Sequence, residues 1–176
     1  VIVCKAMQRI GLLFRGFPCR DLTFWKKAFV TYIRPLVEYC SVVWSPCLEK
    51  YVLEKVQRKF SKRIPCLSAL PYKERLARLN LLPLELRRLH FDLTFYYKLF
   101  TNRSSLDIDK FFTFHTPPAS SRNPMPFIQK PQSATNLLLS SFRYRSIDSW
   151  NSLPLHVKNS SSLSFFKKAL HNIDFA

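Results

Sequence analysis

One segment, residues 48–64, constrains the fold more than any other part of the chain. Its apolar side chains recur at spacings of three and four, at Leu53, Val56, Phe60 and Ile64. Its cations recur in the same way, at Lys55, Arg58, Lys59 and Lys62. Because each residue of an α-helix turns by about 100°, the second stripe points well away from the first. The pattern predicts a helix that packs with one face and presents a cationic face to a partner.

The net charge indicates what kind of partner that is. The chain has 28 Lys and Arg against 11 Asp and Glu, a net charge of +17, and its pI is near 10.1. A protein this basic is attracted to phosphate-rich partners, of which nucleic acid is the commonest. The candidate phosphate-contacting residues are Lys55, Arg58, Lys59, Lys62 and Arg63, with Arg75, Arg78, Arg87 and Arg88 as a second group. The alternative is a solvated basic surface without a partner.

The cysteines and the hydropathy pattern bear on the compartment. The five cysteines are Cys4, Cys19, Cys40, Cys47 and Cys66. They are odd in number, widely spaced and without a C-x-x-C pair, which favours buried thiols in a reducing compartment over disulfides or a zinc site. No apolar run reaches the roughly 18 to 20 residues of a membrane span, and there is no signal-peptide pattern. We therefore expect an intracellular protein, in the nucleus or cytoplasm, with no membrane partner.

A proline and a carboxylate interrupt the apolar stretch before the two-striped helix. Pro35 lacks an amide hydrogen and crowds the carbonyl four residues back, which predicts a kink or break near residues 31–35. Glu38 lies among apolar neighbours, where an unpaired buried carboxylate would cost several kcal/mol. We therefore expect a partner for Glu38, and Arg34, four residues earlier, is one candidate. The alternative is that Glu38 points to solvent from a helix edge.

Further helices follow along the chain. Pro71 and Pro83 each precede a predicted helix, and the second, residues 84–100, is apolar on nearly all sides. Its aromatic residues predict core packing, and a base-stacking platform is the alternative. Asp21 and one of the serines 160–162 are suited to cap helices near the two ends of the chain.

Residues 102–141 have a different composition. They are rich in serine and proline, which predicts a long irregular connection with short extended pieces near Phe127 and Leu138. Arg122 and Lys130 would suit a phosphate-touching arm, and disorder is the alternative. Order resumes at residue 142, and Trp150 is predicted to anchor the last segment on the helices.

The expected fold class is therefore mainly α. It is a bundle of about five to seven helices, and the expectation allows a short β-hairpin before the C-terminal helix. The expected organisation is a helical bundle over 1–101, the irregular connection over 102–141, and a C-terminal motif over 142–176 that packs back on the bundle.

Several stretches together resemble a known family. They are TYIRPLVEYCSVVWSP (31–46, with Trp44), the segment 53–100 that begins LEKVQRKFSKRIPC, SFRYRSIDSWNSLP (141–154) and SFFKKAL (164–170). In this order they are similar to the C-terminal part of non-LTR retrotransposon reverse transcriptases of the Jockey and CR1 type. The resemblance implies that Val1 lies just beyond the polymerase palm and that these helices are the thumb and the region after it. It also implies RNA and DNA as partners, gripped as a template–primer duplex beside the missing palm.

The polymerase chemistry itself is not expected in this chain. It needs carboxylates that hold two divalent metals, and the family's aromatic-x-Asp-Asp motif does not occur. The nearest acid pair is Asp107 and Asp109, which we interpret as a solvated turn, and the four histidines are scattered. We therefore expect no catalytic or metal-binding residues, no cofactor beyond the Mg²⁺ of the parent polymerase, and no small-molecule substrate.

Two functional hypotheses follow from the sequence. The first is a fragment that binds nucleic acid without sequence preference and is not an enzyme on its own. The second is a decayed retroelement remnant, either inactive or serving as a helical protein-interaction module. An independent enzyme is the least favoured reading.

Overall fold

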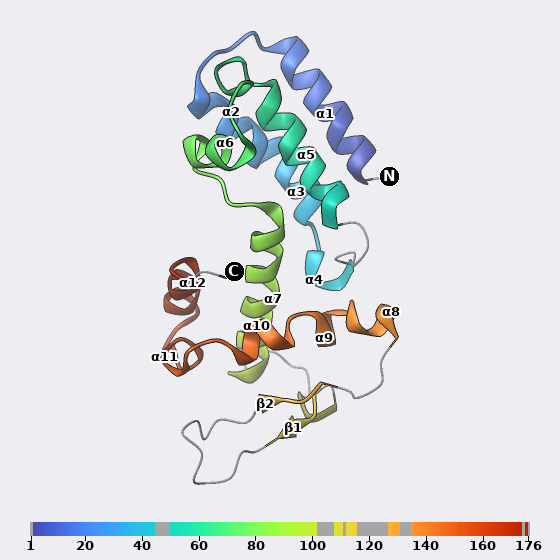
Figure 1. Cartoon of the computed structure of the whole chain (residues 1–176), viewed down its shortest axis with the longest axis vertical. Coiled ribbons are helices and arrows are strands. Elements are labelled where there is room, and N and C mark those ends of the chain that lie inside the picture. The colour runs from blue at the N-terminus through green and yellow to red at the C-terminus, as the bar shows by residue number, and fades with distance from the viewer. Residues whose placement is uncertain are drawn as a thin grey trace. The chain divides into compact units, whose positions relative to one another are not determined.

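The computed structural model describes residues 2–44, 50–101, 108–110, 112–115, 127–130, 135–173 and 175, and these are mainly helical (Figure 1). The α-helices are α1 (Ile2–Gly16), α2 (Leu22–Ala28), α3 (Arg34–Glu38), α4 (Ser41–Trp44), α5 (Lys50–Arg63), α6 (Tyr72–Leu79), α7 (Leu84–Phe100), α8 (Asn136–Leu139), α9 (Phe142–Arg145), α10 (Ile147–Asn151), α11 (Leu155–Lys158) and α12 (Leu163–His171). A π-helix, η1 (Phe29–Ile33), and two 3-10 helices, η2 (Pro65–Leu67) and η3 (Ile108–Lys110), complete the helical elements described. Strands β1 (Phe114–His115) and β2 (Phe127–Ile128) form an antiparallel hairpin. The predicted mainly helical fold class, with a short hairpin before the C-terminal helix, is confirmed, but the described residues form twelve α-helices where five to seven helices were expected.

The chain divides into two compact units. Unit 1 comprises Val1–Ser41 and Leu48–Arg88, and unit 2 comprises Val42–Cys47 and Leu89–Ala176. Helix α7 therefore contributes its first residues to unit 1 and the rest to unit 2. The division falls within this helix, earlier in the chain than the predicted end of the bundle at residue 101.

Unit 1 has an aromatic centre. The ring of Phe14 in α1 stacks on that of Trp25 in α2, with centroids 4.0 Å apart. Phe60 of α5 lies 4.9 Å from Phe29 and 5.5 Å from Phe14, measured between ring centroids. Such ring pairs add about 0.5–1.5 kcal/mol each beyond the burial of their apolar area. The centre therefore ties α5 to α1 and to the α2–η1 segment.

The predicted break before Pro35 is present as a widened helical turn. Residues Phe29–Ile33 are π-helical, and the amide of Arg34 donates to the carbonyl of Phe29, five residues back. Pro35 cannot donate an amide hydrogen and crowds the preceding turn, so the chain widens there and continues as α3. Because the helix is widened rather than ended, Ile33 and Val37 both stay fully buried.

Helix ends follow local chemistry. The carboxylate of Asp21 accepts from the amides of Thr23 (2.9 Å) and Phe24 (3.1 Å) and so caps α2. The hydrogen bond from the Thr23 amide lowers the pKa of Asp21. The hydroxyl of Ser162 accepts from the amide of Phe165 and caps α12. Both predicted caps are confirmed.

Unit 2 is built around the second part of α7. Leu93, Tyr96 and Tyr97 are buried, and Trp150 of α10 is 7% exposed. The Trp150 ring lies 5.7 Å from that of Tyr96, between centroids. Tyr96 and Tyr97 of α7 therefore serve the core, as the helical spacing predicted. Trp150 has the anchoring position expected of it, against the second part of α7 and within unit 2.

Two local predictions were wrong. The stretch around Leu138 is the short helix α8 and not an extended piece, because the Thr135 hydroxyl accepts from the amide of Leu138 and starts a helical turn. The thiols of Cys4, Cys40 and Cys66 are exposed and not buried, and that of Cys19 is partly exposed, while Cys47 lies outside the described residues. Cys4 is exposed because two helical residues turn it about 200° away from buried Ala6.

Candidate nucleic-acid interface

Helix α5 separates its apolar and cationic side chains as the periodicity predicted. Leu53, Val56 and Phe60 are at most 2% exposed, whereas the cations are exposed at Lys55, Arg58, Lys59, Lys62 and Arg63. We call these five cations the α5 basic face. The apolar stripe packs α5 against α1 and α6, which fixes the direction in which the basic face points.

A third stripe of α5 is polar and buried. Glu54 is 8% exposed and accepts from the Tyr72 hydroxyl and, at 3.3 Å, from the amide of Glu85. The side-chain amide of Gln57 donates to the carbonyl of Leu82 at 3.0 Å. Glu54 is the one acid in the sequence of α5. Because it points inward, the helix places no carboxylate of its own on the basic face.

Two arginines of the basic face lie over aromatic rings. The guanidinium carbon of Arg58 is 4.5 Å from the ring centroid of Tyr72, and that of Arg63 is 5.1 Å from that of Phe14. Burial, with the hydrogen bond to Glu54 adding to it, raises the pKa of Tyr72, which keeps this ring neutral. Stacking uses the flat face of a guanidinium and leaves N–H groups at its edge for phosphate oxygens. The two arginines are thus held at the surface in an orientation suited to phosphate.

The second predicted group is mostly not exposed. Arg78 is exposed, but Arg75 is 6% exposed and Arg88 is 4% exposed. Arg75 lies one helical turn before buried Leu79, and Arg88 lies one turn after buried Leu84, so each falls on an inward face. The prediction that Arg75 and Arg88 face phosphates is therefore wrong. Of these three arginines, Arg78 is the one exposed to solvent.

Arg87, also predicted to face phosphates, is engaged inside unit 1. It donates through Nε and Nη2 to the carboxylate of Glu38, the latter at 3.0 Å, and Arg34 Nε lies 3.7 Å from the same carboxylate. The Glu38 side chain is 11% exposed. The expectation that Glu38 needs a partner is confirmed, and the partner with two hydrogen bonds is Arg87. Arg34 is the more distant of the two arginines.

Sequence reasoning did not assign three exposed cations of α1 to the interface. They are Lys5, Arg9 and Arg15. Arg9 donates to the carbonyl of Tyr32 at 2.8 Å, and Arg15 donates to that of Gly11 at 3.3 Å. The spacing of four between Lys5 and Arg9 was a usable signal, since a helix places residues at that spacing on the same side.

The remaining predicted residues have other positions. Pro35 is exposed, and Trp44 is partly buried at the end of α4. Lys130 pairs with Asp148, and Arg122 and Asp107 lie outside the described residues.

The rings of His90 and His171, expected to be scattered, lie 5.2 Å apart between centroids in unit 2. Across the described ranges, no three His, Cys, Asp or Glu side chains gather as they would around a metal ion.

Comparisons with known proteins add no assignment. No protein-family model, curated protein or solved structure matches the chain. In the part of the chain that the structure describes, no helix has both the length and the apolar character that a membrane span requires. Functional assignment therefore depends on the geometry and charge of the residues themselves.

Proposed function

We propose that this chain binds nucleic acid without sequence preference and grips a template–primer duplex beside a reverse transcriptase palm. Its sequence is similar to the thumb and post-thumb region of non-LTR retrotransposon reverse transcriptases, which use RNA and DNA. The observation that carries the proposal is the α5 basic face, in which five exposed cations share a helix whose single acid is buried.

The spacing of the basic face suits a sugar–phosphate backbone. With a rise of 1.5 Å per residue, Lys55 and Lys62 are about 10 Å apart along the helix axis. That length lets one helix reach several successive phosphates, which lie about 3.4 Å apart along the axis of one strand of a duplex. Such contacts give affinity and position without sequence choice.

The proposal assigns no catalytic step to this chain. Nucleotide addition requires carboxylates that hold two divalent metals against the primer end and the incoming nucleotide. In the proposed arrangement these belong to the palm of the parent polymerase. The role of this chain is to hold the duplex in place.

The salt dependence of duplex binding tests the proposal. On duplex DNA the logarithm of the binding constant falls with log salt at a slope of about −0.9 per phosphate neutralised. Combined Arg58→Glu, Lys59→Glu and Lys62→Glu substitutions should make the slope shallower by about 3 units, since about three phosphate contacts are lost. Fluorescence anisotropy with a labelled duplex at several salt concentrations measures the slope.

The matched control changes the same charge elsewhere. Lys110, Lys167 and Lys168 are exposed lysines of unit 2, and their combined reversal to Glu alters the net charge by the same amount. The control should weaken binding through the overall charge but keep most of the wild-type slope. Equal slopes in the two triple variants would contradict the assignment to α5.

A protein-interaction role is the second candidate, and exposed apolar side chains of unit 1 favour it. Leu12 is 62% exposed, Phe17 51%, Tyr32 54% and Tyr39 75%. If these side chains dock on a palm domain, the isolated chain should self-associate once salt screens its net charge of +17, and Leu12→Ser with Tyr39→Ser should reduce the association. Sedimentation velocity measures this, and a monomeric wild-type chain at all salt concentrations would contradict the second candidate.

A further inference from the structure

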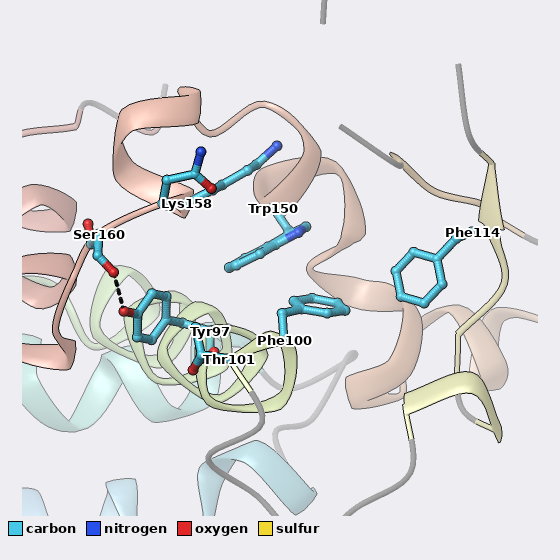
Figure 2. Close-up of a pocket in the computed structure, with 8 residues that line it drawn as sticks. Tyr97, Phe100, Thr101, Phe114, Trp150, Lys158 and Ser160 are labelled. Carbon is cyan, nitrogen blue, oxygen red and sulfur yellow. Dashed lines mark hydrogen bonds between the residues drawn. The ribbon is translucent and has the colours of Figure 1, made fainter. Parts of the chain in front are cut away.

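Unit 2 contains a pocket whose lining includes no residue of the α5 basic face. Its volume is about 500 Å³, within the range of small-molecule sites, and its lining includes Tyr97, Phe100, Phe114, Trp150, Lys158 and Ser160. Figure 2 shows the rings of Tyr97, Phe100 and Trp150 gathered together, with Phe114 on the hairpin side and Lys158 and Ser160 on the other. The residues come from α7, β1, α10 and the region around the end of α11.

The aromatic residues of the pocket divide into a floor and walls. Tyr97 and Trp150 are nearly buried, at 1% and 7% exposed, and form the floor. Phe100 and Phe114 are partly exposed, and their ring centroids lie 5.7 Å apart in an edge-on arrangement. The two phenylalanines therefore keep ring surface to offer to a planar ligand.

Most polar groups of the pocket already make hydrogen bonds within the protein. The Tyr97 hydroxyl donates to the carbonyl of Ser160 at 2.5 Å, and the Ser160 hydroxyl donates to the carbonyl of Val157 at 2.7 Å. The Thr101 hydroxyl donates to the carbonyl of Tyr97 at 2.7 Å. These three hydroxyls have therefore used their hydrogens within the protein.

Among the described residues that line the pocket, Lys158 is the charged one. Its Nζ donates to the carbonyl of Asn151 at 3.0 Å, and no described carboxylate forms an ion pair with it. Burial lowers the pKa of Lys158. A partly buried ammonium with one neutral acceptor has two N–H donors left and an uncompensated charge, which an anion would satisfy.

We propose that this pocket binds one nucleotide of a single-stranded nucleic acid, with the base against Phe100 and Phe114 and the phosphate on Lys158. Stacking on aromatic rings beside a cation is how proteins hold single strands without sequence choice. The inference rests on the proposed nucleic-acid function and adds a single-strand site to the duplex-binding face.

Calorimetric titration of the full chain with uridine 5′-monophosphate, uridine and a uridine tetranucleotide tests the site. Lys158→Met should weaken binding of the monophosphate and the tetranucleotide about tenfold or more, the effect of losing a hydrogen bond to a charged group, and leave uridine unchanged. Phe114→Ala should weaken all three by about tenfold, since it removes stacking. The tetranucleotide should bind at least as tightly as the monophosphate, because it brings four bases to a pocket that holds one.

Matched controls lie on α12. Lys168→Met removes the same charge from an exposed lysine, and Phe165→Ala removes a ring that is 64% exposed, both outside the pocket lining. Neither should change monophosphate binding. Circular dichroism checks that the pocket variants remain folded, and Lys158→Met should keep the helical signal, since it removes a partly buried charge.

The possible failures are distinguishable. Unchanged tetranucleotide binding in Lys158→Met, or a tetranucleotide that binds more weakly than the monophosphate, would overturn the single-strand site. The triple reversal on α5 should leave monophosphate binding intact while it weakens duplex binding. If that variant kept full duplex binding and Lys158→Met still lost the monophosphate, the α5 proposal would fail and the pocket would stand.

Discussion

The two units of the chain differ in net charge and in aromatic content. Unit 1 has 18 Lys and Arg and 6 Asp and Glu, a net charge of +12, whereas unit 2 has 10 and 5, a net charge of +5. Unit 2 has 16 of the aromatic residues and unit 1 has 10. Unit 1 thus concentrates exposed cations, and unit 2 concentrates rings around one core.

The two units also differ in how deeply their ion pairs are buried. Asp92 of unit 2 is 4% exposed and accepts from Nε and Nη2 of Arg145, each at 2.7 Å, and from the Ser146 hydroxyl at 3.1 Å. Arg145 also donates to the carbonyl of Val42 at 2.8 Å, which ties the Val42 segment into unit 2. The Glu38 and Arg87 pair of unit 1 is closer to solvent. Net charge therefore predicts binding only where the cations are not already paired.

The largest expected effect is on the unit 2 ion pair. Asp92→Ala leaves Arg145 partly buried without its carboxylate, and breaking a buried pair in this way costs about 3–5 kcal/mol. We expect unit 2 to lose its near-ultraviolet circular dichroism at a much lower temperature than in the wild type. Thermal melts monitored at the aromatic bands measure this.

The control for Asp92 is an exposed pair of the same unit. Asp148 pairs with Lys130 with its side chain 77% exposed, so Asp148→Ala should cost at most about 1 kcal/mol. A loss of stability for Asp148→Ala that equals that for Asp92→Ala would contradict the assignment of Asp92 as the buried centre of the pair.

A smaller effect is expected in unit 1. Glu38→Gln removes the charge that Arg87 and Arg34 share and should lower the free energy of unfolding by about 1–2 kcal/mol, since the pair is not fully shielded from water. Glu74→Gln, at an exposed position of α6, is the control and should be nearly neutral. Chemical denaturation of wild type, Glu38→Gln and Glu74→Gln measures the difference. Identical midpoints for wild type and Glu38→Gln would show that the pair does not stabilise unit 1.

The smallest effect concerns Lys158. Burial lowers the pKa of this lysine below its ordinary 10.5, so the unfolded chain holds the proton more tightly than the folded chain does. The wild type should therefore gain stability as pH rises from the folded pKa toward 10.5. Lys158→Met should melt slightly higher than wild type at pH 7, and the difference should shrink toward pH 10.5. A difference that grows with pH would contradict the direction of the shift.

Much of unit 1 could be predicted from the sequence. The two stripes of α5, the widened turn before Pro35 and the cap at Asp21 depend on local spacing and local hydrogen bonds, which the sequence contains directly. The burial of Arg75 could have been predicted too, since it lies one turn before Leu79 on the same helical face.

The rest depends on contacts between distant residues. Arg87 is 49 residues from Glu38, and Arg145 is 53 residues from Asp92, so no local pattern pairs them. The pocket likewise forms only where α7, the hairpin and α11 come together. Nothing in the local sequence distinguishes Lys158 from a surface lysine. Long-range packing decided these positions.

Lysine footprinting shows which lysines the duplex covers. The full chain is reductively methylated with and without a saturating DNA or RNA–DNA duplex at low salt, and each lysine is quantified by mass spectrometry. We expect protection of Lys55, Lys59 and Lys62 of unit 1, with Lys167 and Lys168 of unit 2 still reactive. Protection of Lys167 and Lys168 with Lys55, Lys59 and Lys62 unprotected would contradict the claim that the α5 basic face grips the duplex.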